Sequence, residues 1–522
     1  MTTPATTGTA TEARQRWRGR AGIALFWAAL AVYYVFIMSA GRWTNWPIWT
    51  AMYDKQAEAF RAGHLYLLEP ASPALRALPD PLNPANMRFW RWDLSYYDGR
   101  LYLYWGFVPA VLLAAAKVLL RVHTVVGDGV PVFFYAMGRA IVGTLLIRAL
   151  ARTVAPAPPR WAVWMATLVF VLANPIPYLL SRGAVYEQAI AAGSLFVFSG
   201  IYFGLGAVTR AGSRAGNLSL AASGLGFGLG AGSRISLLPT AGLLTAWTIV
   251  ACWRAAGGGG WRRLLRPTLL AGVPALAIVL VQLTINYLRF GQWLEFGVKY
   301  QMGFTFLSGP RFIPTNVFLY LLEPVVRTCA FPYLTTKWNV PRAGVPQWVP
   351  WPADMRIEPA VGILVVVPFV WLLIVVAPFW LARRRARAAA EVEASLAASA
   401  GAVLTPGPLA PWTRRWVMGT LAIGSTVGAL PALLIFSNSM RYEWDFVSAL
   451  FLAATLASWW ALRTPQSRAG RVAVSVLVAA LAVVSIVAGI LLGFVGYFDN
   501  FMRHNPALMV HLKQMFDLCR HH

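Results

Sequence analysis

The stretch WAVWMATLVFVLANPIPYLLSRGAVYEQAIAAGSLFVFSGIYFGLG, residues 161–206, decides the fold class of this chain. It holds two apolar runs, 161–181 and 189–206, and roughly twenty apolar residues are enough for a helix to cross the hydrocarbon core of a membrane. The turn between the runs carries Arg182, Tyr186 and Glu187. Two membrane helices joined by a short polar turn are therefore predicted, with a carboxylate at the membrane boundary.

Apolar runs of this kind recur from end to end of the chain. Its 522 residues are 58% hydrophobic and 12% charged, about half the charged fraction of a soluble protein. The sequence therefore predicts an all-α polytopic membrane protein with about eleven transmembrane helices. We expect these helices near residues 22–40, 131–150, 161–181, 189–206, 217–232, 236–253, 268–288, 360–382, 416–436, 446–462 and 472–496.

The formal net charge of +26 reflects arginines that cluster in short segments between the apolar runs. Such clustering is typical of the positive-inside rule, so we expect membrane lipids and no nucleic acid as partners. The apolar run 101–121 decides the orientation. If it crossed the membrane, the arginines within 148–160 and 210–214 would lie outside, so we predict a juxtamembrane helix on the outer surface instead.

This orientation divides the chain into a series of parts. They are a basic cytoplasmic N-terminus (1–21), a transmembrane core (22–305) with a first outer loop (41–130) and a short outer turn (182–188), a second outer loop (306–359), C-terminal transmembrane helices (360–496) with a cytoplasmic linker (383–415), and an outer C-terminal tail (497–522).

Asp54 lies on the outer side, shortly after the first predicted helix. It is a candidate general base that would deprotonate an acceptor hydroxyl at the membrane surface. Glu58 follows one helical turn later on the same face and is its natural substitute. The alternative is a solvated loop aspartate paired with a neighbouring cation, Lys55 or Arg61.

Glu187 lies on the same side, in a turn too short to form a domain. It would position a substrate, ligate a divalent cation through hard oxygen contacts, or hold Arg182 in place. The alternative is a carboxylate near a helix N-terminus, where the helix dipole favours a negative charge. Tyr186 stands beside it as a further substrate contact.

Two arginines are candidates for binding a phosphate. Arg234 lies between apolar stretches with no polar loop around it, so its charge needs a partner or must reach the headgroups. An arginine fork suits the phosphate of a lipid-linked donor. In MRYEWDF, residues 440–446, Arg441 and Asp445 either contact phosphate or sugar or form a structural ion-pair cluster with Glu443.

Other sequence patterns do not indicate a catalytic or binding site. The glycines of SGLGFGLGAGS, residues 223–233, follow no strand, so we expect close helix packing rather than a dinucleotide site. GDG at 127–129 is expected to be a turn. The three cysteines lack metal-type spacing, so no zinc site is expected, and the sequence leaves open whether a divalent cation is required. Cys329 and Cys519 both fall outside, and the sequence leaves open whether they are bridged.

The candidate residues belong to an ordered set of segments. After Asp54 come AGHLYLLEPASPALRALPDPLNP, WDLSYYDGRLYLYWGFVPAVLLA, YAMGRAIVG, AVYEQAI, GAGSRISLLP, INYLRFGQWLEFGVKYQ and RYEWDF. This order resembles that of bacterial membrane glycosyltransferases of the GT-C superfamily, which includes protein O-mannosyltransferases and aminoarabinose transferases. The resemblance covers about residues 1–305 and 436–450.

The resemblance implies an enzyme of the bacterial cytoplasmic membrane that takes a sugar from a polyprenyl-phosphate carrier on the outer face. It matches the family's base to Asp54 and implies that 101–121 is a juxtamembrane helix. Arg234, with Arg441, would stabilise the departing phosphate. The acceptor would be a glycan, a lipid or a protein. Two other functions fit the sequence: a transporter or flippase of a lipid-linked sugar, and a non-catalytic factor of envelope assembly.

Overall fold

The computed structural model describes residues 7–154, 157–303, 306–336, 345–376, 411–464 and 467–519, with side chains from residue 21 onward. Within this part of the chain, nine helical segments are long and apolar enough to cross a membrane. They are Ala21–Met38, Gly129–Thr153, Arg160–Leu180, Val185–Thr209, Ile235–Ala255, Trp261–Phe290, Pro411–Leu434, Met440–Ala461 and Arg468–His504. The prediction of a multi-pass helical membrane protein is confirmed at this level.

The predicted number of eleven membrane helices stays a prediction. The segment 217–232 is a helix, α9 (Arg214–Ser233), but its six glycines and its serines make it too polar to count among the nine. The segment 360–382 begins with two short pieces, α13 (Ile363–Val366) and η6 (Pro368–Val370). The rest of that predicted helix, from residue 377, lies outside the described residues, as does most of the predicted linker 383–415.

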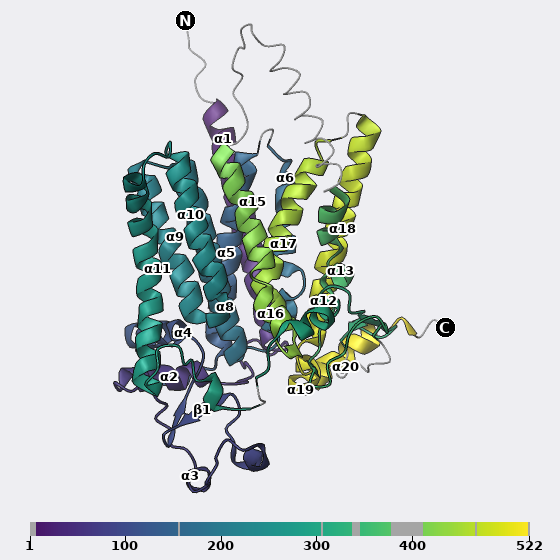
Figure 1. Cartoon of the computed structure of the whole chain (residues 1–522). Helices are drawn as coiled ribbons and strands as arrows, with labels where there is room; N and C mark the ends of the chain where they lie inside the picture. Colours follow the sequence, from purple (N-terminus) through teal and green to yellow (C-terminus); the bar gives the residue numbers. More distant parts are fainter. Residues whose placement is uncertain are drawn as a thin grey trace, which may run out of the picture.

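The long helices lie side by side in one bundle (Figure 1). They are α1 (Thr7–Met38), α5 (Gly129–Thr153), α6 (Arg160–Leu172) with α7 (Ile176–Leu180), α8 (Val185–Thr209), α9, η2 (Ile235–Leu237) with α10 (Leu238–Ala255), α11 (Trp261–Phe290), α15 (Pro411–Thr426) with α16 (Leu430–Leu434), α17 (Met440–Ala461) and α18 (Arg468–Val495). From α1 to α11, successive long helices run in opposite directions, so the connections after α1, α6–α7, α9 and α11 meet at one end, at the bottom of Figure 1. We call this end the loop end.

The loop end carries the short elements of the fold. The first loop contains α2 (Met52–Arg61), α3 (Pro73–Arg76), η1 (Pro84–Phe89), β1 (Leu94–Tyr97), β2 (Arg100–Tyr102) and α4 (Val108–Leu120). Strand β1 pairs antiparallel with β2 and also with β3 (Gln301–Met302), which follows α11 and η3 (Val298–Tyr300). This three-stranded sheet ties the first loop to the segment after α11.

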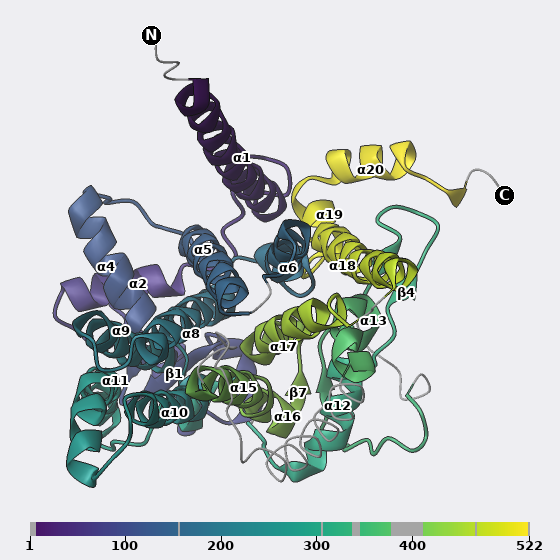
Figure 2. The ribbon, with the colours of Figure 1, turned by 90° about the horizontal axis from the view of Figure 1, so that it is seen from above.

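The apolar run 101–121 does not form a bundle helix. It ends strand β2 and continues as α4, whose thirteen residues are too few to cross a membrane. Figure 2 shows α2 and α4 lying crosswise to the bundle helices. The start of α4 is at the loop end, because a Cβ on Gly106 would be 2.1 Å from the carbonyl oxygen of Gly232, at the end of α9. The geometry agrees with the predicted juxtamembrane helix.

Helix α9 packs closely on its neighbours through its glycines. A Cβ on Gly224 would be 2.0 Å from the carbonyl oxygen of Ala271 on α11, and one on Gly226 would be 2.8 Å from the backbone nitrogen of Gly200 on α8. No larger residue fits at these positions without moving the helices apart. The prediction of close helix packing for 223–233 is thus confirmed.

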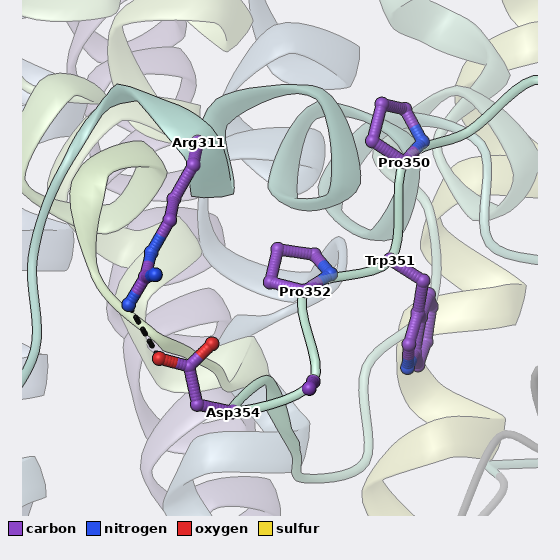
Figure 3. A pocket seen from close by; sticks show the side chains of 6 residues that line it. Arg311, Pro350, Trp351, Pro352 and Asp354 are labelled. Atoms are coloured by element: carbon purple, nitrogen blue, oxygen red, sulfur yellow. Dashed lines mark hydrogen bonds and ion pairs between the residues drawn. The ribbon is translucent and has the colours of Figure 1, made fainter.

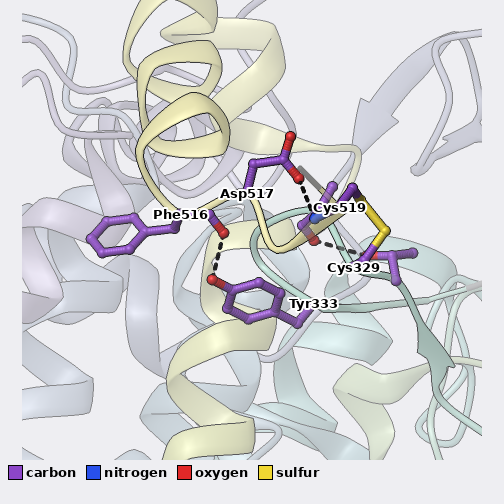
Figure 4. The surroundings of a disulfide bond; sticks show 7 residues. Cys329, Tyr333, Phe516, Asp517 and Cys519 are labelled. Carbon is purple, nitrogen blue, oxygen red and sulfur yellow. Dashed lines mark hydrogen bonds between the residues drawn. A yellow bond between two sulfur atoms is a disulfide. The ribbon is translucent and has the colours of Figure 1, made fainter. Parts of the chain in front are cut away.

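The segments beyond α11 complete the loop end. They are η4 (Pro310–Phe312), α12 (Ile313–Leu321), the pair β4 (Val326–Arg327) and β5 (Leu334–Thr335), the parallel pair β6 (Arg356–Ile357) and β7 (Ser437–Asn438), α19 (Asn500–His504) and α20 (Pro506–Met515). Cys329 and Cys519 form a disulfide with their Cα atoms 5.2 Å apart (Figure 4). Nearby, the Tyr333 hydroxyl donates a hydrogen bond to the carbonyl oxygen of Phe516 at 2.6 Å. These contacts fasten the C-terminal tail to the second loop.

Candidate functional site

Asp54 is buried in an ion pair between α2 and α4. Its Oδ1 atom is 2.6 Å from Nζ of Lys117, and the two side chains are 5% and 3% exposed. Lys117 also lies 2.6 Å from Oε1 of Glu58. The partners expected from the sequence are wrong, because Lys55 pairs with Glu69 and Arg61 with Glu58.

The ion pair shifts the pKa values of its members. Burial opposes the charge of Lys117, but its hydrogen bonds to Asp54 and Glu58 outweigh burial and raise its pKa above the ordinary value. The hydrogen bond from Lys117 lowers the pKa of Glu58, with burial acting in the opposite direction. These shifts favour the charged forms of Lys117 and Glu58, and the Asp54 carboxylate is in contact with the ammonium group of Lys117.

Asp128 fixes α2 against the bundle. Its carboxylate accepts hydrogen bonds from the Thr50 hydroxyl at 2.5 Å and from the backbone N–H groups of Met52 and Tyr53 at 3.0 and 3.1 Å. Burial raises the pKa of Asp128 to about 6, although these hydrogen bonds act to lower it. Thr50 in turn accepts a hydrogen bond from the N–H of Val185 at 2.8 Å. The expected turn at 127–129 thus joins the starts of α2, α5 and α8.

Glu187 lies in the first turn of α8, where its charge faces the positive end of the helix dipole. Its side chain is fully buried, and Arg182 is the cation beside it, with NH1 3.5 Å from Oε1. Neither carboxylate oxygen accepts a hydrogen bond from any described residue. The guanidinium of Arg182 stacks over the rings of Tyr497 and Phe498, at 5.0 and 5.3 Å from their centroids.

Arg441 is stacked on Tyr186, its guanidinium carbon 4.1 Å from the ring centroid. It is also paired with Glu358, with NH2 3.0 Å from Oε1. The hydroxyl of Tyr186 donates a hydrogen bond to Asp93 and lies 3.3 Å from the hydroxyl of Tyr104. Helices α8 and α17 and the first and second loops therefore meet at these two side chains.

Arg234 finds its partner 211 residues along the chain. Its NH2 and Nε atoms each lie 3.0 Å from Oδ2 of Asp445, and both side chains are almost fully buried. Its guanidinium lies 5.4 Å from the ring centroid of Tyr442, the same distance as that of Arg441. Tyr442 thus lies between the two arginines. The expected partner for a buried Arg234 is confirmed, and snorkelling to the headgroups is not observed.

These contacts define one group of side chains, which we call the loop-end cluster. It consists of Asp93, Tyr104, Arg182, Tyr186, Glu187, Arg234, Glu358, Arg441, Tyr442, Asp445 and Tyr497. It brings together six of the eight residues predicted from the sequence. The other two, Asp54 and Glu58, lie on α2 with Lys117.

Helix α2 nevertheless reaches toward the cluster. Burial raises the pKa of Tyr53 well above its usual range, and the nearby charge of Arg234 partly offsets this effect. Tyr53 is the neighbour of Asp54 on α2. The common cavity expected for Asp54, Glu187 and Arg234 stays a prediction, because neither of the two cavities described below is lined by any of them.

The first cavity is an open hollow of about 520 Å³ on the second loop (Figure 3). It is lined by Pro350, Trp351, Pro352 and an exposed ion pair between Arg311 and Asp354. The second, of about 320 Å³, lies at the opposite end of the bundle. Among the residues that the structure describes, no group of three or more His, Cys, Asp or Glu side chains is placed to hold a metal ion.

Sequence reasoning missed several members of these groups. Lys117 had a signal, since it is the single charge in the apolar segment VPAVLLAAAKVLL, and such a residue needs a buried partner. Asp93 carried no such signal, and its φ of 65°, unusual for a non-glycine residue, is visible only in the structure. Glu358 and Tyr497 come from distant segments and carried no local signal.

The described residues define a multi-pass helical membrane protein with a buried cluster of arginines, carboxylates and tyrosines at one end of its bundle. The chain matches no protein-family model, and no curated protein or solved structure is significantly similar to it. Its function therefore has to be inferred from the chemistry of the cluster.

Proposed function

We propose that this protein is an inverting membrane glycosyltransferase of GT-C type. It transfers a hexose or pentose from a polyprenyl-phosphate carrier to an acceptor on the outer face of a bacterial cytoplasmic membrane. One observation carries the proposal. Three arginines and tyrosines lie together with Glu187 where α9 ends and α8 and α17 begin, and the buried Glu187 carboxylate accepts no hydrogen bond from a described residue. The arginines are suited to bind the phosphate of the donor, and the carboxylate is suited to take the proton of the acceptor hydroxyl.

The charge distribution supports an outward orientation of the cluster. Two described turns at the opposite end of the bundle, 210–213 and 462–464, each hold an arginine and no acidic residue. Short loops rich in Lys and Arg face the cytoplasm. The loop end then faces outward, where lipid-linked sugars are donors and no nucleotide site is needed.

The proposed reaction is a direct displacement. A carboxylate takes the proton of the acceptor hydroxyl while its oxygen forms a bond to the anomeric carbon. The bond from that carbon to the phosphate oxygen breaks, and the polyprenyl phosphate leaves with the electron pair. Arg441 and Arg234 stabilise the charge on the departing phosphate, because fixed cations in a buried site need little reorganisation. Tyr186 holds Arg441 in position through the stacked ring.

Two carboxylates are candidates for the base. Asp54 is bound to Lys117 at 2.6 Å, so it accepts a proton only at the cost of this ion pair. Neither oxygen of Glu187 accepts a hydrogen bond from the part of the chain that the structure describes, and its cation, Arg182, is 3.5 Å away. We therefore assign proton acceptance first to Glu187, and to Asp54 if substrate binding draws Lys117 toward the phosphate.

Turnover of an undecaprenyl-phosphate sugar by the purified protein tests the proposal. Glu187→Gln should lower turnover by about two to four orders of magnitude and leave donor binding largely unchanged, since it removes proton acceptance and little volume. Arg441→Gln should weaken donor binding as well. Asp80→Asn, an exposed change in the first loop, is the matched control and should have no effect. Full turnover in both Glu187→Gln and Asp54→Asn would exclude the proposed chemistry.

A flippase of a lipid-linked sugar is the second candidate. It is favoured by two buried ionisable side chains in the bundle, Arg139 on α5 and Glu443 on α17. Arg139 is bonded to Ser194 and Phe170, whereas both oxygens of Glu443 lack a hydrogen-bond partner among the described residues. Transfer of a labelled lipid-linked sugar between the leaflets of a proteoliposome, without acceptor, would support this function and not the transferase.

A further inference from the structure

The second cavity lies far from the loop-end cluster, between the end of α8, the start of α9 and the connection from α10 to α11. It has a volume of about 320 Å³. Leu220 and Cys252 form an apolar inner wall, and Arg262, Arg263 and Arg266 line it from the first turns of α11. The cavity thus combines an apolar interior with a basic entrance.

Among the described residues, no carboxylate pairs with the three arginines. The chain contains no Asp or Glu between Glu187 and Glu295, a segment that includes every residue around the cavity. Their side chains are exposed, and none forms an ion pair with a described residue. They also stand at the N-terminus of a 30-residue helix, whose dipole adds to the positive potential. An anion is the ligand that this potential favours.

A second observation points to the same ligand. Trp253 lines the cavity, and its indole N–H is buried without a hydrogen-bond partner among the described residues. Arg254 stacks on its ring at 4.4 Å and brings a fourth positive charge close to the entrance. A buried donor without an acceptor is costly, and a phosphate oxygen would satisfy it.

We propose that this cavity binds the phosphate of an anionic phospholipid from the adjoining membrane leaflet. The arginines take the phosphate and the wall of Leu220 and Cys252 receives the first carbons of the lipid. Basic pockets between membrane helices are suited to such headgroups. The site is separate from the loop-end cluster, so this proposal can be tested independently of whether the protein transfers sugar.

Native mass spectrometry of the full-length protein tests the proposal with dioleoylphosphatidylglycerol and dioleoylphosphatidylcholine as probes. The wild type should bind the anionic lipid preferentially. The variant Arg262→Gln/Arg263→Gln/Arg266→Gln should lose roughly a hundredfold in affinity for it, because each arginine near an anionic lipid contributes about a fivefold factor. The matched control carries the same charge change at three exposed arginines outside the cavity, Arg414, Arg415 and Arg468.

The outcomes separate the explanations. Loss of preference in the cavity variant but not in the control supports the site, whereas equal loss in both shows general surface attraction and overturns it. Trp253→Phe, which leaves the charge unchanged, should lower affinity about fivefold through the lost donor, and no change would contradict the proposed contact. If inorganic phosphate at millimolar concentration displaces the lipid completely, the site takes phosphate from water, and the lipid assignment is wrong.

Discussion

Replacing Lys117 by methionine tests the buried ion pair that fastens α2 to α4. The change keeps most of the apolar length of the side chain and removes only its charge. Lys117 is 3% exposed and lies 2.6 Å from both Asp54 and Glu58. After the change, Asp54 would remain buried as a charge without a cation. We therefore expect local opening of α2 from α4, with the membrane bundle intact.

The free-energy cost of Lys117→Met is estimated from the two carboxylates that lose their cation. Removing one partner of a buried ion pair costs about 3–5 kcal/mol, because the other charge stays in a poor solvent. Glu58 is 36% exposed, so water replaces its lost cation and it adds little. The cost assigned to Asp54 is therefore about 3 kcal/mol, toward the lower end of that range. A loss of this size in the free energy of local opening should make amide exchange in α2 roughly a hundredfold faster.

Hydrogen exchange followed by mass spectrometry measures this rate for α2 and for a bundle helix as an internal control. The double variant Asp54→Asn/Lys117→Met carries no buried charge and should recover a large part of the lost protection. Additive effects of the two single changes, or a change in α2 of less than about threefold for Lys117→Met, would refute the reasoning.

Three further predictions concern other parts of the fold. Hydrogen bonds, first from Arg91, lower the pKa of Glu69 to about 2, so its stabilising effect is complete above its ordinary pKa of 4.5 and is lost as pH falls toward 2. Limited proteolysis of the first loop between pH 6 and pH 2 should show increasing cleavage. Gly224→Ala should lower the melting temperature, because its Cβ would lie 2.0 Å from a carbonyl oxygen of α11, whereas Gly242→Ala, with nothing within 4 Å, should be neutral or slightly stabilising. Cys329→Ser should release the C-terminal tail, detected as faster proteolysis after residue 500 with an unchanged melting temperature of the bundle.

The sequence predicted the membrane helices because their signal is local. A run of about twenty apolar residues is a sufficient condition for a membrane helix, whatever surrounds it. The crosswise position of 101–121 was also predictable, since the arginines of the neighbouring turns require it. The glycines of α9 predicted close helix packing, and the apolar residues around Arg234 predicted that its charge needs a partner.

The partners themselves were not predictable. Arg234 meets Asp445, and Arg441 meets Glu358, 83 residues before it in the chain. Such pairs depend on which helices become neighbours, and a single sequence does not give that information. The local alternatives for Asp54 were wrong for the same reason, because adjacent cations on α2 point to other acids and the distant Lys117 takes their place.

The two ends of the bundle differ in how their charges are used. At the loop end, Arg234 and Arg441 are each matched by a carboxylate, so the cluster is held in one arrangement before any ligand arrives. Cations fixed in this way are suited to catalysis, because they already face the position where negative charge develops during the reaction. At the opposite end, Arg262 and Arg266 have no carboxylate in the described structure and remain exposed. Unmatched charges cannot be oriented in this way, but they attract any anion at the membrane surface, and this makes binding without chemistry the simpler role for that end.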